Sequence, residues 1–463
     1  MIENIGLFGA LFLLIVLALR GRNIIFSALL ASLVVIVTNP ISLADSLNQY
    51  FIFGKLGAFS FAGKFFILFA CGAMFGRVMG ESKAATSIAF ALADKLGAQR
   101  TLWIVTIACA LLTYSGVVVF VVIFAIYPLG LKLIEQANIP KRLLVGAITL
   151  GSGTFTLTAL PGTPSIQNVI ASSALGTDLF AAPLLGIIAT IIMFGAGIWY
   201  LETQRKAAQI NNEGLVNVAN DASSTSKETL SESVNLPHWS LAIIPLFVVI
   251  FCILTPRILS GIYGAELTNG DDTFSQLMTF ATTQIILWPS ISLFIGCIVG
   301  LLIFKSIRVQ AVKVLGDGTQ DSILPLINTA AVIGFGGVVT QTQGFADFVQ
   351  FLLTIDLPPL LSMFVSVSLS SSIVGSSAGG LQIFLQTMAE SYLALGIPAD
   401  VLHRIATIAS GGFDSLPHCG AVVAILTITG MTHKQAYKDI FVITVVFPVI
   451  SALAIIGWVA FFY

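Results

Sequence analysis

Charged side chains are scarce in this chain, and their scarcity excludes most classes of soluble protein. Asp, Glu, Lys and Arg make up 9% of the 463 residues, whereas soluble domains carry about 25%. Hydrophobic residues make up 57%, and the mean hydropathy is +0.99. The formal net charge is −1, so we do not expect nucleic acid as a partner. The composition predicts an all-α polytopic membrane protein that is embedded in the lipid bilayer.

Histidine, cysteine and several catalytic motifs are few or missing. The four histidines and five cysteines are scattered, with no spacing typical of a metal site or a disulfide framework. No His-x-x-x-His pair and no G-x-x-x-x-G-K-[ST] phosphate loop occurs. We therefore expect no enzyme activity, no metal and no cofactor. An ATP-driven mechanism is disfavoured, and a channel would be expected to show repeated pore motifs.

Long apolar runs predict the membrane spans, at about 20 residues per crossing. Glycine, proline and small polar residues interrupt four further apolar stretches, at 101–135, 141–172, 358–392 and 403–430. Acid rather than base precedes the first apolar run, which therefore reads as a span and not as a cleaved signal peptide. The uninterrupted spans are expected at 4–19, 24–38, 59–79, 180–200, 239–254, 279–304, 323–339 and 439–461.

A polar segment rich in Ser and Asn divides the chain into two halves, and its composition is typical of a flexible linker. We expect it to lie in the cytoplasm. The predicted parts are N-terminal spans with an interfacial segment (1–58), a first inverted repeat (59–202), the cytoplasmic linker (203–237), connecting spans (238–322) and a second inverted repeat (323–463).

The placement of Lys and Arg predicts two re-entrant hairpins. With Arg20 in the cytoplasm, Arg100 and Lys132 both fall inside only if residues 101–135 enter the membrane and return. Residues 340–400 contain neither Lys nor Arg, which is consistent with an outside location flanking a second hairpin. The resulting topology has ten crossings, two hairpins and both termini outside.

Two interrupted segments share an outline and predict an inverted repeat. Pro140 precedes Ser152 by 12 residues, as Pro398 precedes Ser410, and the two blocks are offset by 258 positions. Each continues through Ser-Gly to Leu-Pro. Proline removes a backbone donor and glycine weakens a helix, so both segments should be broken helices. Two such breaks, one per half, are the usual indication of a transporter's central site.

Three motifs carry a family resemblance: GSGTFTLTALPGTPSIQN at 151–168, SGGFDSLPHCGAVVAIL at 410–426 and THKQAYKDI at 432–440. They resemble the gluconate permease (GntP) family of proton-coupled carboxylate symporters. This resemblance implies a fold of the wider ion-transporter superfamily, in which homodimers carry hairpins and broken helices in a mobile transport domain. It also implies the bacterial inner membrane. The second motif is similar to that of hydroxybutyrate-type members.

The first break offers hydrogen-bond donors that suit an anion, because unwound backbone leads into a helix N-terminus there. The alternative is that hydroxyls in membrane helices bond to backbone or hold helices together. The candidate substrate-binding residues are Ser152, Gly153, Thr154, Thr156, Thr158, Gly162, Thr163, Gln167 and Asn168.

The second break contains two ionisable residues, Asp414 and His418, which we predict to carry the coupling proton. Alternatively, each is a helix cap. Arg404 is expected to extend to the interface and not to bind the carboxylate. Further substrate-binding candidates lie in this break and at the two hairpin tips, where small residues permit close approach: Ser410, Gly411, Gly412 and Ser415, then Ser115, Gly116, Ser376, Ser377 and Gly379.

The predicted function is import of a small monocarboxylate such as gluconate, 3-hydroxybutyrate or a related hydroxy acid by proton symport. One carboxylate bound by hydroxyls and amides fits a site without an expected intramembrane cation better than a dicarboxylate bound by arginines. Sodium coupling is the alternative, because unwound carbonyls with Ser, Thr and Asp suit sodium as well as a proton relay.

Overall fold

The computed structural model describes residues 2–20, 22–97, 100–117, 119–211, 213, 236–263, 272–354, 356–417 and 419–462. Every regular element in these ranges is helical, so the predicted all-α class is confirmed. The first half contains α1 (Ile2–Leu19), α2 (Ile24–Thr38), α3 (Leu43–Asp45), the π-helix η1 (Ser46–Phe53), α4 (Ala58–Glu81), α5 (Ala84–Leu96), α6 (Thr101–Tyr114), α7 (Val119–Ala137), α8 (Lys141–Gly153), α9 (Phe155–Thr158), α10 (Ile166–Leu175) and α11 (Pro183–Ile210).

The second half follows the same order of long helix, short helix, hairpin, broken helix and long helix. It contains α12 (Trp239–Ala242), α13 (Ile244–Tyr263), α14 (Thr273–Thr283), α15 (Leu287–Ile303), α16 (Lys305–Arg308), α17 (Ala311–Val339), α18 (Gln343–Thr354), α19 (Pro359–Val374), α20 (Ser377–Thr387), α21 (Ala389–Ala394), α22 (Ala399–Ser410), the 3₁₀-helix η5 (Phe413–Ser415), α23 (Gly420–Thr429), α24 (His433–Phe441), the π-helix η6 (Val442–Val446) and α25 (Phe447–Phe462).

Helices α4 and α17 occupy equivalent places in the two halves and pack against each other in opposite directions. Gly318, near the start of α17, lies against Met74 near the end of α4. Gly334, near the end of α17, lies against Ala58 at the start of α4. A Cβ on Gly318 would lie 2.7 Å from Met74 Cα, so the absence of a side chain there permits the close approach of the two helices. An antiparallel pair of equivalent helices is what an inverted repeat produces.

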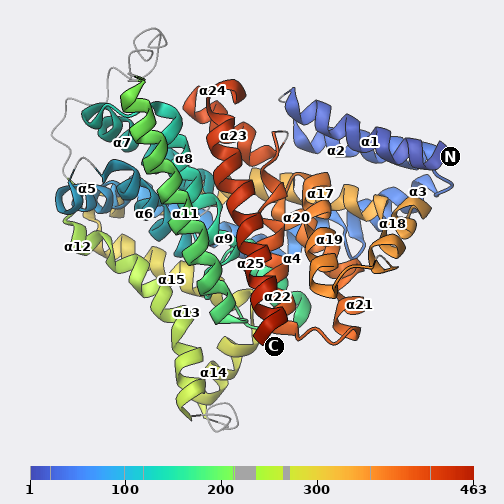
Figure 1. The fold of residues 1–463 in the computed structure, drawn as a ribbon. Helices are drawn as coiled ribbons and strands as arrows, with labels where there is room; N and C mark the ends of the chain where they lie inside the picture. Colours follow the sequence, from blue (N-terminus) through green and yellow to red (C-terminus); the bar gives the residue numbers. More distant parts are fainter. Residues whose placement is uncertain are drawn as a thin grey trace.

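The last helices of the two halves are also antiparallel neighbours (Figure 1). The Ser451 hydroxyl of α25 donates to the Ala189 carbonyl of α11 at 3.2 Å. At the opposite end, the Tyr200 hydroxyl of α11 donates to Asp439 of α24 at 2.7 Å. Asp439 is buried and also pairs with Arg142 at the start of α8, at 2.7 Å. Contacts between the two halves therefore fix both ends of this helix pair.

The two stretches predicted to be re-entrant hairpins, 101–135 and 358–392, form helical hairpins. In the first, the Thr101 hydroxyl at the start of α6 donates to the Leu133 carbonyl near the end of α7, at 3.5 Å. In the second, the hydroxyls of Ser362 in α19 and Tyr392 in α21 lie 2.9 Å apart. The two ends of each stretch are thus side by side, and each chain segment returns to the side from which it entered.

Several boundaries differ from the predicted spans for identifiable reasons. The expected span 279–304 is not one helix, because α14 and α15 meet at an angle of 107°. Helix α17 starts at residue 311, twelve positions before the predicted apolar run. Helix α11 continues through residues 203–210 of the expected linker, where Gln, Arg, Lys and Ala favour helix. Residues 214–235 of that linker lie outside the described part of the chain.

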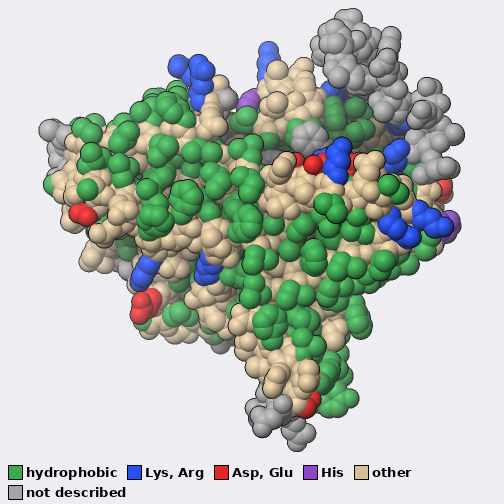
Figure 2. Space-filling model, turned by 180° about the vertical axis from the view of Figure 1, so that it is seen from behind, with side chains coloured by type: hydrophobic (Ala, Val, Ile, Leu, Met, Phe, Trp, Pro, Cys, Tyr) green, Lys and Arg blue, Asp and Glu red, His purple; other side chains and the backbone are tan. Residues whose placement is uncertain are grey.

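The surface is that of a membrane protein. Figure 2 shows apolar side chains spread across this face, with Lys and Arg mostly toward its upper and right-hand margins. Within the described residues, seven spans have the length and hydropathy of membrane spans when two bent helix pairs are each counted as one, and five do so as single helices. The number of crossings and the orientation of the termini stay predictions. The five single helices are Leu43–Glu81, Pro183–Ile210, Trp239–Ser260, Ala311–Val339 and His433–Phe462.

Candidate functional site

The first broken helix loses its regular structure where the sequence predicts. Helix α8 ends at Gly153, and Thr154 adopts φ −123° and ψ −110°, which are not helical values. After the single turn of α9, the chain passes through Pro161 and Gly162, whose φ of +81° favours glycine. The Gly162 N–H donates to the Leu179 carbonyl at 2.9 Å. The chain then re-enters a helix at α10, where the Ser165 side chain caps the N-terminus.

Most hydroxyls of the first break are bonded to their own backbone. Ser152, Thr154, Thr156 and Thr158 are all buried, and each donates to a carbonyl four or five residues earlier in the chain, at 2.7 to 3.2 Å. Thr163 differs from them, because its buried hydroxyl has no hydrogen-bond partner. The alternative reading of backbone bonding therefore applies to four of the five hydroxyls, and Thr163 is left as the free donor.

Gln167 connects the first break to the tip of the second hairpin. Its Nε2 donates to the Ser377 hydroxyl at 2.7 Å, and its buried Oε1 has no partner. Gln167 lies in the first turn of α10, and Ser377 is the first residue of α20. Ser376 caps α20 as Ser165 caps α10. Two capped helix N-termini thus meet at one point, and each carries a partial positive charge.

The second break contributes its carboxylate to the same point. Asp414 lies in η5, and its side chain interacts with the hydroxyl and the backbone amide of Ser377. The Ser415 hydroxyl donates to Asp414 Oδ1 at 2.9 Å. Cys419 occupies the N-cap of α23, so the alternative reading of Asp414 as the cap of that helix is wrong. His418, the second predicted proton carrier, lies outside the described residues.

The other residues of the second break lie against the first break. A Cβ on Gly411 would come within 2.6 Å of Thr158 Cγ2, so the two breaks are in van der Waals contact there. The Ser410 hydroxyl donates to the Thr407 carbonyl at 2.7 Å. Gly412 lies beside Pro448 and Val449 of α25. The two breaks are therefore neighbours in space although they lie about 258 positions apart in the sequence.

The first hairpin tip also reaches the first break. Gly116 has φ +95°, and a Cβ there would lie 3.0 Å from Pro164. The preceding Tyr114 donates its hydroxyl to the Pro161 carbonyl at 3.0 Å, while Ser115 donates to the Leu112 carbonyl. At the second tip, a Cβ on Gly379 would lie 2.6 Å from Val374. Both tips are closed by packing that only glycine allows.

Two buried residues of α22 were not among the predicted site residues. Arg404 is 0% exposed, so the expectation that it extends to the interface is wrong. Its guanidinium donates to the carbonyls of Ala159, Leu179 and Ala181 at 2.9 to 3.3 Å. These carbonyls lie on both sides of the first break. Arg404 stays buried because the unwound backbone supplies acceptors that a regular helix would not leave free.

His403 is likewise 0% exposed and joins α22 to α10. Its Nε2 lies 2.7 Å from Asn168 Oδ1 and its Nδ1 lies 2.7 Å from the Thr177 hydroxyl. Asn168 Nδ2 already donates to the Thr163 and Leu179 carbonyls, at 2.8 Å each. The Asn168 oxygen must therefore accept from His403 Nε2–H. Every polar atom of the Asn168 side chain has a partner within the protein.

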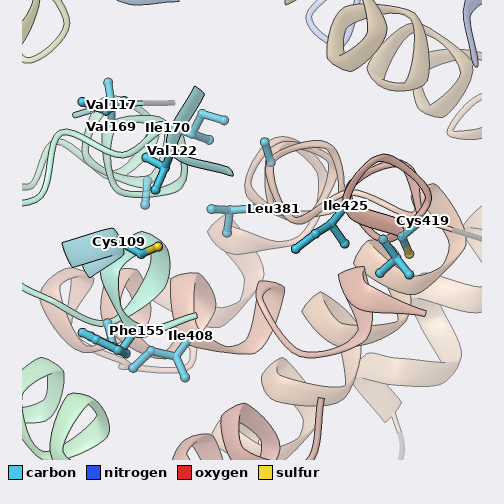
Figure 3. Close-up of a cluster of buried hydrophobic side chains, with 14 of the residues drawn as sticks. Cys109, Val117, Val122, Phe155, Val169, Ile170, Leu381, Ile408, Cys419 and Ile425 are labelled. Carbon is cyan, nitrogen blue, oxygen red and sulfur yellow. The ribbon is translucent and has the colours of Figure 1, made fainter. Parts of the chain in front are cut away.

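Apolar side chains from both halves surround the breaks. Figure 3 shows Phe155 of α9 and Ile408 of α22 pointing toward each other, with Leu381 of α20 between the groups from the two halves. Val169 of α10 and Val122 of α7 belong to the same buried apolar cluster. The polar atoms at the meeting point of the breaks are consequently enclosed by hydrocarbon, where an unpaired donor or acceptor is costly.

A separate cavity of about 810 Å³ lies away from the breaks. It is lined by η1, α18 and the ends of α17 and α20, and includes Thr340 and Gln341, which form a further polar cluster in the sequence. In the part of the chain that the structure describes, no group of three or more His, Cys, Asp and Glu is placed to hold a metal ion.

The second hairpin tip matches the sequence motif of a hydrolase nucleophile but lacks the strand-to-helix turn in which that motif lies. Residues 375–379, GSSAG, match G-x-S-x-G, a motif that in hydrolases lies between a strand and a helix. Here the tip lies between two helices, and Ser377 contacts Gln167 and Asp414. The tip therefore meets the two breaks at one point, through Gln167 and Asp414.

Comparison with known proteins agrees with this architecture. The sequence profile of the GntP family permeases matches residues 4–412. The chain belongs to the GntP permease family. A GntP relative, the uncharacterized transporter YxjC of Bacillus subtilis, is 38% identical and aligns with 97% of this chain and 98% of its own length. An uncharacterized transporter of Haemophilus influenzae is 24% identical over 76% of this chain and 74% of that protein.

A solved structure shares the fold of this GntP permease. The crystal structure of the Alcanivorax borkumensis YdaH transporter, described as having an unusual topology, superposes with a TM-score of 0.55. The match covers 97% of this chain and 98% of that one, at 16% identity. The family and the relatives identify the protein as a multi-pass membrane transporter.

Proposed function

We propose that this permease is a secondary active transporter that imports a small hydroxylated monocarboxylate together with a proton. The observation that carries the proposal is the contact between Gln167, Ser377 and Asp414, which brings both breaks and the second hairpin tip to one point. Gluconate, 3-hydroxybutyrate and related hydroxy acids are the candidate substrates.

Two features support an anion at this point. The N-termini of α10 and α20 face it, and helix N-termini attract negative charge. The hydroxyl of Thr163 and the Oε1 of Gln167 are buried and unpartnered, which costs about 1–3 kcal/mol for each group unless a ligand pairs with it. The Thr163 hydroxyl suits the substrate carboxylate, and Gln167 Oε1 suits a substrate hydroxyl. This combination favours a hydroxy acid over a simple fatty acid.

Asp414 supports coupling to a proton. Its ionised carboxylate and the substrate carboxylate would compete for the Ser377 hydroxyl and backbone amide, and two like charges at one site repel. Protonation of Asp414 removes this competition, so the proton and the anion enter together. Charge balance through a single carboxylate also fits transport of a monocarboxylate. His418 stays a second candidate for the same role.

The test compares net accumulation with exchange in proteoliposomes that contain the full-length protein. Asp414→Asn imitates the protonated state. It should abolish accumulation driven by a pH gradient while labelled gluconate or 3-hydroxybutyrate still exchanges against unlabelled substrate. Ser391→Ala, a change on α21 away from the breaks, serves as a matched control that should accumulate substrate normally. Accumulation by Asp414→Asn at the wild-type level would overturn the proposed coupling.

Uptake by the same proteoliposomes distinguishes proton coupling from sodium coupling. A pH gradient without sodium should drive uptake, and a sodium gradient without a pH gradient should not. The reverse result would replace the proton with sodium as the coupling ion. Failure of every hydroxy acid to exchange would overturn the substrate class.

A further inference from the structure

Arg404 is a buried cation without a carboxylate in contact. Each of its three nitrogens donates to backbone carbonyls, and no ion pair of Arg404 occurs in the described part of the chain. Hydrogen bonds to carbonyls satisfy the geometry of the guanidinium, but they do not neutralise its unit charge. A buried charge is retained at a large cost in free energy unless an opposite charge compensates it.

The nearby acidic residues do not supply that compensation fully. Asp178 and Asp400 are the carboxylates whose charge acts on Arg404. Asp178 is exposed and already pairs with Arg257. Asp400 is exposed at the start of α22, where solvent screens its charge. The region around the first break therefore has an excess of positive charge in its interior.

This excess charge lies beside the predicted anion site. The Leu179 carbonyl accepts from both Arg404 Nη2 and Asn168 Nδ2, and Asn168 Nδ2 also donates to the Thr163 carbonyl. Asn168 follows Gln167 directly in the chain. Arg404 is thus linked through the shared Leu179 carbonyl to Asn168, which bonds to the backbone of Thr163 and is the neighbour of Gln167 in α10.

We propose that Arg404 supplies the positive charge that holds a carboxylate substrate at the first break, acting across the backbone it binds and not by direct contact. This inference rests on the proposed function and adds a residue that determines charge specificity. Without direct contact, the guanidinium stays bonded to the protein in both the empty and the loaded state. The substrate is recognised by its charge through Arg404 and by its hydroxyls through the unpartnered groups.

The test measures charge selectivity in the full-length protein. The readout is the ratio of binding constants for 3-hydroxybutyrate and for its uncharged amide, 3-hydroxybutyramide. Arg404→Lys keeps the charge and should keep this ratio near the wild-type value. Arg404→Gln removes the charge and should lower the ratio about tenfold or more, with little change in binding of the amide. An unchanged ratio in Arg404→Gln, or equal losses in both variants, would overturn the inference.

A second variant covers the case in which Arg404→Gln does not fold. Asp178→Asn leaves all guanidinium bonds in place and removes a negative charge that opposes Arg404. It should raise the ratio about twofold to threefold at low salt, and added salt should reduce the gain. A ratio that stays unchanged or falls would contradict the proposal. Wild-type protein that binds neither compound, nor gluconate, would instead overturn the proposed substrate class.

Discussion

The two broken helices occupy equivalent places in the two halves but differ in their charges. The first has no ionisable side chain between Leu143 and Leu175, whereas the second contains His403, Arg404 and Asp414. The residues 258 positions before His403 and Arg404 are Val145 and Gly146. His403 and Arg404 of the second half both point into the first, where they bind the chain on either side of its break. The first break thus carries only neutral polar groups, and the second half places a buried guanidinium and a carboxylate beside them.

This difference indicates how an inverted repeat acquires two separate tasks. A symmetric pair of breaks would offer two equal sites for one ligand. In the proposed function, the neutral break binds the hydroxyl groups of the substrate and Asp414 of the second break carries the proton, and Ser377 lies between them. Four predictions test this division, in order of decreasing effect.

The largest effect is expected from removing a contact between the halves. His403→Leu leaves Asn168 Oδ1 and the Thr177 hydroxyl buried without partners, which should lower the free energy of unfolding by about 2–3 kcal/mol. Thermal unfolding in detergent measures the change. His433→Leu is the matched control, because the hydrogen bond of His433 to a described residue, the Pro417 carbonyl, lies within its own half. An equal loss in both variants would contradict the special role of the contact between halves.

Gln167→Leu should separate the first break from the hairpin tip. Loss of the bond to Ser377 and of the free Oε1 is expected to weaken substrate binding by about tenfold or somewhat more, as for one or two buried hydrogen bonds. Loss of the buried Nε2 bond to Ser377 should also lower the free energy of unfolding by about 1 kcal/mol, whereas loss of Oε1, which has no partner in the protein, should not. Ser172→Ala, which removes another buried unpartnered hydroxyl of α10, should bind substrate normally. If both variants lose affinity equally, Gln167 has no specific role.

Thr163 and Thr156 should respond in opposite ways to the same substitution. Thr163→Val removes a hydroxyl without a protein partner, so it should weaken binding by about fivefold, or roughly 1 kcal/mol, and leave stability unchanged. Thr156→Val removes a bond to the Gly151 carbonyl and should lower stability by a similar amount while affinity is retained. Titration of binding and thermal unfolding of both variants distinguish these effects. Interchanged results would place the substrate elsewhere in the break.

The smallest effect concerns the ion pair at the far end of the first break. Arg142 binds Glu213 through two hydrogen bonds, and these lower the pKa of Glu213 below its ordinary value near 4.5. A lowered pKa stabilises the folded state above the ordinary value, and the stabilisation is lost as pH falls through the lowered pKa. The free energy of unfolding of the wild type should exceed that of Glu213→Gln by less than about 1 kcal/mol at neutral pH, since the pair is partly exposed.

Thermal unfolding of wild type and Glu213→Gln between neutral pH and pH 4 measures this difference. The two curves should converge toward the acid end. A difference that grows on acidification would show that the pair does not act through the Glu213 charge.

The sequence predicts the helices and the breaks of this chain well, because both depend on local chemistry. Residues 24–38 form a helix with the predicted limits, since a continuous apolar run and flanking turn residues determine it. Gly153, Pro161 and Gly162 break the first segment for reasons that belong to those residues alone. The boundaries of the larger repeat units stay predictions, as does the role of each site residue.

The burial of His403 and Arg404 could not be predicted in the same way. Arg404 in an apolar segment near a helix start has the pattern of a side chain that extends to the interface. Its carbonyl partners lie more than 220 positions away, and they are free to accept only because another helix is broken. The sequence does contain one indication of their burial, because His403 and Arg404 are adjacent polar residues in the predicted broken segment 403–430. Their meaning depends on tertiary contacts that no local pattern contains.

The contact between Gly411 and Thr158 has a consequence for related sequences. A side chain at position 411 would collide with Thr158 Cγ2, and φ of −89° at Gly411 permits any residue. Volume alone therefore restricts this position, and a smaller residue at 158 would release the restriction. The two positions are expected to covary, with alanine or serine at 411 accompanied by serine or alanine at 158. A larger residue at position 411 of the second break should therefore occur in related sequences together with a smaller residue at position 158 of the first.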